Sequence, residues 1–167
     1  MSESPTASGV PCVVVGVDGS AGAKQALDWA IDEARLRKTP LRIVHAWMFG
    51  YIGGSANTYP TWGRSIGVYT SVGEDLQDVR SAAEDLVEQA ISNARADRSG
   101  VEIERSVVQG AAAKVLIDAA SADDLLVVGS RGHGELAGLL LGSVSQQCVH
   151  HAVCPVVVVR ATNGSKG

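Results

Sequence analysis

The sequence has no long apolar segment and no cluster of basic residues. No run of about 18 apolar residues occurs, as a membrane-spanning helix requires, and the opening residues contain no apolar signal core. The 14 basic residues are interspersed among 18 acidic ones, and the formal net charge is −4. Proteins that bind nucleic acid through a broad basic face have the opposite balance. We therefore expect neither a membrane nor a nucleic acid as a partner.

Cysteine pairs and metal-ligand clusters are also missing. Cys12, Cys148 and Cys154 are odd in number and show no C-x-x-C spacing, which is typical of reduced, buried thiols in a cytoplasmic protein. Two of the four histidines are adjacent, and adjacent residues of a helix point in different directions. We therefore predict a cytoplasmic protein without a metal site.

The composition is that of one globular domain. Apolar residues make up 46% of the 167 residues and charged residues 19%, which is enough to bury a substantial core. We expect a flexible leader at residues 1–11, one domain at residues 12–160 and a flexible tail at residues 161–167. Residues 48–73 show no sustained periodicity, and a stretch of this length is expected to be a functional or a mobile loop.

Within the domain, short apolar runs alternate with helical patterns. Strands are expected at residues 12–17, 41–47, 102–108, 124–128 and 155–160, and helices at residues 20–38, 74–98, 111–120 and 142–152. This alternation predicts an α/β fold: a single open, five-stranded, mostly parallel, Rossmann-like sheet with helices on both faces. Pro155 cannot donate to a ladder, so the last strand is expected at an edge. Ligands of such sheets bind beyond the carboxyl ends of the strands, where the winding direction reverses.

The turn after the fourth strand is rich in glycine. Gly129, Gly132 and Gly134 can adopt φ > 0 and allow a ligand close to the backbone. Nine residues separate Gly132 from a glycine and a serine that begin the last helix, whose free amides and dipole favour an anion. The spacing is compatible with a plain surface turn followed by a serine N-cap. Its place at the end of a buried strand favours a phosphate site, with hydroxyls from Ser143 and Ser145.

The turn after the first strand, residues 16–20 (GVDGS), is not a dinucleotide fingerprint. Asp18 stands where the second glycine of G-x-G-x-x-G is needed, and the P-loop pattern G-x-x-x-x-G-K-[ST] is absent from the sequence. Asp18 could cap the first helix. If the first and fourth strands are neighbours, its carboxylate instead faces the ligand and could accept hydrogen bonds from a ribose hydroxyl or an adenine amine.

Three segments, VVVGVDGS, VVGSRGHG and LLLGSVSQQCVHHAVCPVVVV, resemble the universal stress protein family along essentially the whole chain. The pattern G-x-x-G, nine residues, then G-S is that of the ATP-binding branch. The resemblance implies strand order 3-2-1-4-5 and homodimers that pair through the last strand at Val156, Val157, Val158 and Val159. It implies an ATP site, with Mg²⁺ as an optional companion. The implied binding residues are Gly16, Val17, Asp18, Ala46, Val128, Gly129, Ser130, Arg131, Gly132, His133, Gly134, Gly142, Ser143, Val144 and Ser145.

One residue of this chain differs from the pattern of some family members, and a second observation bears on whether the chain is an enzyme. Arg131 stands where some members have histidine, which should change the phosphate contacts. No general base or metal-binding carboxylate pair accompanies the phosphate loop, so we predict no catalytic residue and a nucleotide-dependent regulatory or stress-response protein. The alternatives are a slow ATPase or autokinase, or a protein that binds AMP or cyclic AMP.

Overall fold

The structure, a computed structural model, describes residues 9–49, 68–69, 76–132 and 140–161. Its elements in chain order are β1 (Val13–Gly16), α1 (Ala21–Arg37), β2 (Leu41–Phe49), β3 (Val68–Tyr69), α2 (Leu76–Asn93), the 3₁₀ helix η2 (Ala96–Arg98), β4 (Ile103–Gln109), α3 (Ala112–Ala119), β5 (Leu125–Gly129), α4 (Ser143–His151) and β6 (Val156–Val159). None of the described helices is long and apolar enough to cross a bilayer. Most of the expected leader, of the expected tail and of residues 48–73 lies outside the described residues.

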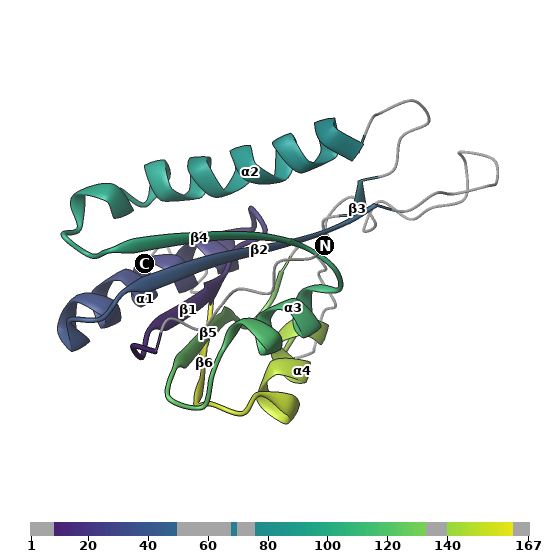
Figure 1. The fold of residues 1–167 in the computed structure, drawn as a ribbon. Helices are drawn as coiled ribbons and strands as arrows, with labels where there is room; N and C mark the ends of the chain where they lie inside the picture. Colours follow the sequence, from purple (N-terminus) through teal and green to yellow (C-terminus); the bar gives the residue numbers. More distant parts are fainter. Residues whose placement is uncertain (1–8, 50–67, 70–75, 133–139, 162–167) are drawn as a thin grey trace, which may run out of the picture.

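The longer strands form a parallel sheet in the order β4-β2-β1-β5-β6 (Figure 1). Numbered along the chain, these strands have the order 3-2-1-4-5, so the expected fold class is confirmed. β6, which follows Pro155, is an edge strand among the described strands, as expected. The expectation for β2 was too short: the strand continues to Phe49, and Met48 and Phe49 pair with β3. A two-residue strand such as β3 is too short to show a period in the sequence.

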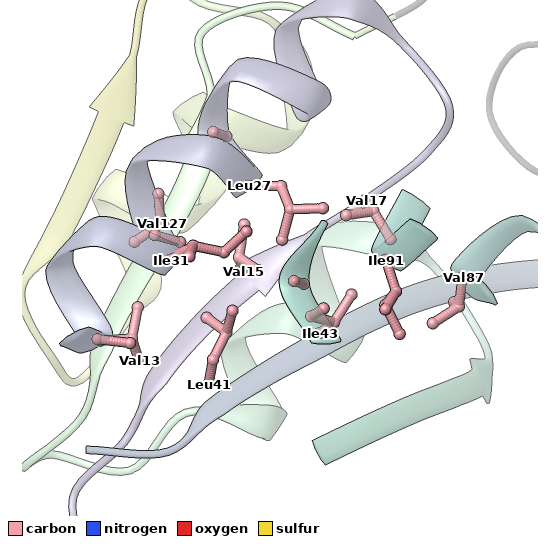
Figure 2. Close-up of a cluster of buried hydrophobic side chains, with 14 of the residues drawn as sticks. Val13, Val15, Val17, Leu27, Ile31, Leu41, Ile43, Val87, Ile91 and Val127 are labelled. Atoms are coloured by element: carbon pink, nitrogen blue, oxygen red, sulfur yellow. The ribbon is translucent and has the colours of Figure 1, made fainter. Parts of the chain in front are cut away.

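Helices cover both faces of this sheet (Figure 1). Val13 and Val15 of β1 pack into the layer formed with α1 and α2, and Val14 packs into the layer formed with α3 and α4. Figure 2 shows the first layer, with labels on Val13, Val15, Val17, Leu27, Ile31, Leu41, Ile43, Val87, Ile91 and Val127. Burial on both faces explains why the central strands are continuous apolar runs.

Helix α1 has a defined cap at each end. Ser20 is the N-cap, and its Oγ accepts a hydrogen bond of 3.1 Å from the backbone N–H of Ala23. The helix ends at Arg37, and its C-cap Lys38 adopts a left-handed conformation with φ 56°. The N-cap is therefore Ser20, and the expectation that Asp18 caps this helix was wrong.

The amino ends of the strands are held by a buried acid. Asp124 accepts hydrogen bonds from the backbone N–H of Cys12 at 2.8 Å and of Ser121 at 2.7 Å. This contact joins the start of β1 to the turn before β5. Burial raises the pKa of Cys12 to about 12 and that of Cys148 to about 11, so both thiols are poor nucleophiles at neutral pH.

Candidate functional site

The two turns singled out in the sequence lie beside each other. β1 and β5 are parallel neighbours, with Val13 opposite Leu125 and Val15 opposite Val127, so both strands end at the same side of the sheet. β2 flanks β1 on its other side, so the winding direction of the sheet reverses between β1 and β5. This is the place where open α/β sheets bind their ligands.

The turn after β1 is fixed by its own hydrogen bonds. The backbone N–H of Val17 donates to the carbonyl of Val44 at 2.9 Å and so continues the pairing with β2. Asp18 Oδ1 accepts a hydrogen bond of 2.9 Å from the N–H of Ser20. Gly19 has φ 80°, a left-handed conformation that glycine adopts without strain. The Asp18 carboxylate is therefore held at the mouth of the turn and is partly exposed.

The backbone of the turn after β5 packs closely against the backbone of the first turn of α1. A Cβ on Gly22 would lie 2.4 Å from the carbonyl oxygen of Arg131, and one on Gly129 would lie 2.8 Å from the carbonyl carbon of Gly22. Neither Gly129 nor Gly132 is among the described glycines with positive φ. These two glycines therefore do not use a left-handed conformation, and at Gly129 the neighbouring backbone of Gly22 leaves no space for a side chain.

The Asp18 carboxylate lies directly beside Gly132. A Cβ on Gly132 would lie 2.8 Å from Asp18 Oδ2. Gly142 is close to the same point, since its Cβ would lie 3.8 Å from the N atom of Gly132. The carbonyl of Ser130 holds the last helix there, because it accepts a hydrogen bond from the Gly142 N–H at 2.7 Å and one from Ser145 Oγ at 3.0 Å. The structure thus brings together residues from three separate parts of the sequence.

The first turn of α4 has the features of an anion site. Its N-cap is Gly142, and no side-chain hydrogen bond to this cap is present among the described residues. The amides of the first turn and the positive end of the helix dipole therefore face the space beside Gly132. Ser143 is exposed. Ser145 is 2% exposed and its hydroxyl donates to backbone carbonyls, so it shapes the turn and is not a free donor.

The other expected binding residues differ in where they lie. Gly16, Ala46 and Val128 lie in the strands, and Gly16 faces Leu116 of α3 so closely that a Cβ would lie 2.8 Å from its side chain. Arg131 is exposed. Val144 lies in the first turn of α4 and is half-buried, and His133 and Gly134 lie outside the described residues.

Our prediction of no catalytic residue took the nucleophile-elbow pattern G-x-S-x-G to be absent, which was wrong, because residues 63–67 (GRSIG) match it. They too lie outside the described residues, and residues 57–62 (NTYPTW) before them are not the apolar run that this motif requires.

Sequence reasoning missed His45. This residue is 2% exposed, and its Nδ1 lies 2.8 Å from the carbonyl oxygen of Val17 in the turn after β1. Burial lowers the pKa of His45 below its ordinary value, against smaller opposing effects of the Val17 carbonyl and the Asp18 carboxylate. The ring is therefore neutral at physiological pH. The sequence feature that could have indicated this residue is that His45 is polar and lies in an apolar strand, on the same face of the strand as Leu41 and Ile43.

Charged residues also line a hollow of about 300 Å³ far from these turns, between α1 and the end of α2. Its lining residues are Asp28, Ile31, Asp32, Arg35, Ala94, Arg95 and Ser99. They belong to the ends of the helices that lie near the amino ends of the strands, so the hollow is not part of the candidate site. Among the described residues, no group of three histidines, cysteines or acids is placed to hold a metal ion.

Comparison with known sequences identifies close relatives of this chain. A model of the universal stress protein family matches residues 12–160. Universal stress protein Rv2623 of Mycobacterium tuberculosis is 36% identical over 147 residues, which are 88% of this chain and 46% of that protein. Universal stress protein Rv2005c of the same organism is 34% identical over 148 residues, which are 89% of this chain and 45% of that protein. The chain thus spans about half the length of these curated relatives.

Comparison with solved structures gives the same picture. A universal stress protein solved in complex with cAMP is 26% identical, with a TM-score of 0.59, and the match covers 91% of this chain and 98% of that one. The fold is also that of universal stress protein UspA from Lactobacillus plantarum, at 19% identity and a TM-score of 0.61 over 90% of this chain and 98% of that one.

Proposed function

Because this chain belongs to the universal stress protein family, we propose that it binds an adenine nucleotide, ATP in particular, at the turns after β1 and β5. The observation that carries the proposal is the convergence of Asp18, Gly132 and the first turn of α4. A carboxylate that accepts hydrogen bonds suits the adenosine end of a nucleotide, and helix amides suit its phosphates. The relative solved in complex with cAMP supports an adenine nucleotide as the ligand class.

The same geometry favours a triphosphate. Gly132 lies next to both Asp18 Oδ2 and the N-cap of α4, and we propose that a nucleotide which contacts both extends along this turn. ATP supplies β- and γ-phosphates for the amides of Ser143 and Val144, whereas cyclic AMP carries one phosphate closed onto its ribose. Mg²⁺ would accompany the phosphates. Arg131 is exposed beside this path and would add a cation.

We expect ATP to bind at least about tenfold more tightly than cyclic AMP, a difference of about 1.4 kcal/mol. The physical reason is the additional anion contact at the start of α4. Calorimetric titration of nucleotide-stripped protein with ATP, AMP and cyclic AMP measures this difference. Mass spectrometry of ligand released from freshly purified protein identifies the nucleotide that the protein carries. Binding of none of the three would disprove the proposed function.

A cyclic nucleotide is the second candidate ligand, and the relative in complex with cAMP favours it. In that case cyclic AMP would bind as tightly as ATP or more tightly, and it would be the ligand released from the purified protein. The first turn of α4 would then contribute little, and Ser143→Pro, which removes an amide at the first helical position where proline is tolerated, would leave the affinity unchanged.

We further propose that bound ATP regulates the protein and is not rapidly consumed. In the described parts of the two turns the carboxylate is that of Asp18, and we propose that it contacts the adenosine end of the nucleotide, away from the phosphates. Backbone amides hold phosphates equally well before and during reaction, and such uniform binding does not lower a barrier. We expect turnover below about 1 s⁻¹, the low end of ordinary enzymes. A steady-state phosphate-release assay with magnesium tests this, and a faster rate that one site substitution abolishes would establish the ATPase alternative.

The proposal includes a homodimer in the cytoplasm. β6 is an edge strand among the described strands, and its four valines are only half-buried. An exposed apolar edge of this kind needs a cover, and a second copy of the same strand would supply it. The three cysteines are free and buried, which suits a reducing compartment.

A further inference from the structure

His45 is a polar residue in an apolar layer. It lies on β2 in the alternating series with Leu41 and Ile43, on the side that α1 and α2 cover. Its Nδ1 is 2.8 Å from the carbonyl oxygen of Val17. A carbonyl oxygen can only accept, so Nδ1 carries the proton and donates. Nε2 is then an acceptor, and in the described part of the chain it is buried without a hydrogen-bond partner.

Packing alone does not account for an imidazole at this position. A leucine would fill the same layer, as Leu41 does, without leaving a ring nitrogen unpaired in the core. Unlike a leucine, the imidazole can donate a hydrogen bond to Val17. The N–H of Val17 still pairs with the carbonyl of Val44, but Val17 lies one residue beyond the last residue of β1. The His45 ring supplies the donor for the Val17 carbonyl at that point.

The Val17 carbonyl belongs to the peptide group that carries Asp18. Because a peptide group is planar, fixing this carbonyl fixes the direction in which the chain enters Asp18. Asp18 Oδ1 accepts a hydrogen bond from the N–H of Ser20, and Asp18 Oδ2 faces Gly132. The position of the Asp18 carboxylate against Gly132 thus depends on the bond between His45 and Val17.

We propose that His45 is a positioning residue for the nucleotide site: its Nδ1–H holds the Val17–Asp18 peptide so that the Asp18 carboxylate is set against Gly132 before the ligand arrives. This inference rests on the proposed function for its effect on nucleotide affinity. A preset carboxylate spares the ligand the cost of ordering it, so loss of the donor weakens binding without removing any ligand contact.

The test compares two substitutions at the same position. His45→Asn keeps an N–H at the place of Nδ1, and His45→Leu keeps the volume and removes the donor. Ile43→Val, two residues earlier on the same face, is the matched control because it perturbs the core without touching the turn. We expect ATP affinity within about threefold of the parent protein for His45→Asn and Ile43→Val. For His45→Leu we expect a loss of at least about tenfold, or about 1.4 kcal/mol. Equal affinity in both His45 variants would overturn the inference.

A second measurement does not depend on the ligand. Asp18 Oδ1 accepts the amide hydrogen of Ser20, so the exchange rate of that amide reports whether Asp18 is held. We expect exchange at least about tenfold faster in His45→Leu and unchanged in His45→Asn and Ile43→Val. This pattern in a protein that binds no nucleotide would leave the positioning role standing and disprove the proposed function. An unchanged Ser20 amide in His45→Leu would disprove the positioning role by itself.

Discussion

Replacing Gly132 by valine is expected to abolish ATP binding while the sheet stays folded. The new Cβ would lie 2.8 Å from Asp18 Oδ2, closer than such atoms approach in real structures. Asp18 can relieve the contact by swinging its short side chain, so the fold survives at low cost. The displaced carboxylate no longer meets the nucleotide. We expect the affinity to fall at least about a hundredfold, or about 2.8 kcal/mol, measured by calorimetric titration.

The graded variant Gly132→Ala sharpens this prediction. Since the first side-chain atom causes the contact, alanine should already lose most of the affinity that valine loses. Gly9→Val serves as the control, because a Cβ on Gly9 would meet no atom within 4 Å. A folded Gly132→Ala protein with the affinity of the parent would show that Asp18 and Gly132 do not act together on the ligand.

Replacing Val158 by proline is expected to convert the proposed dimer into a monomer. The N–H of Leu126 donates to the carbonyl of Pro155, and the N–H of Ser130 donates to the carbonyl of Val159. Alternate residues of β6 therefore face β5, and the backbone of Val158 faces the open edge. Proline at this position removes an outward N–H and places its ring where a second copy would pair, while the bonds to β5 remain.

Sedimentation at micromolar concentration measures this effect. The parent protein should sediment at about twice the chain mass of 17.3 kDa, and the proline variant at the mass of one chain. Val158→Thr keeps the N–H and the β-branched shape and should remain dimeric. A parent protein that is monomeric with and without ATP would disprove the dimer. A dimeric proline variant would place the contact between copies elsewhere on the surface.

The sequence predicts the class of this fold because the relevant signal is local. Continuous apolar runs of β-branched residues, separated by helical patterns, indicate strands that are covered on both faces. β6 is at an edge as expected, but the missing donor of Pro155 is not the reason, because the carbonyl of Pro155 pairs with the N–H of Leu126 and the residue therefore faces β5. The order of the strands is not local, and it came from the family resemblance. The short strand β3 has too few residues for any period to be visible.

The contacts of the site were harder to predict than its residues. The sequence singles out Gly129 and Gly132 but not Gly22, because the approach of Gly22 to Arg131 joins residues more than a hundred positions apart. For the same reason the role of Ser145 was assigned to phosphate, whereas its hydroxyl bonds the carbonyl of Ser130. His45 was not predicted to be a site residue, and only its distance to Val17 reveals the connection with Asp18.

The bond between the Ser130 carbonyl and the Gly142 amide has a consequence for how this site can change during evolution. It fixes both ends of the segment between Gly132 and Gly142 next to each other, independently of the number of residues that separate them. The entropy of closing a loop grows slowly, by about 0.6 kcal/mol for each doubling of its length. We therefore expect insertions or deletions within residues 135–139 to leave Gly142 next to Ser130.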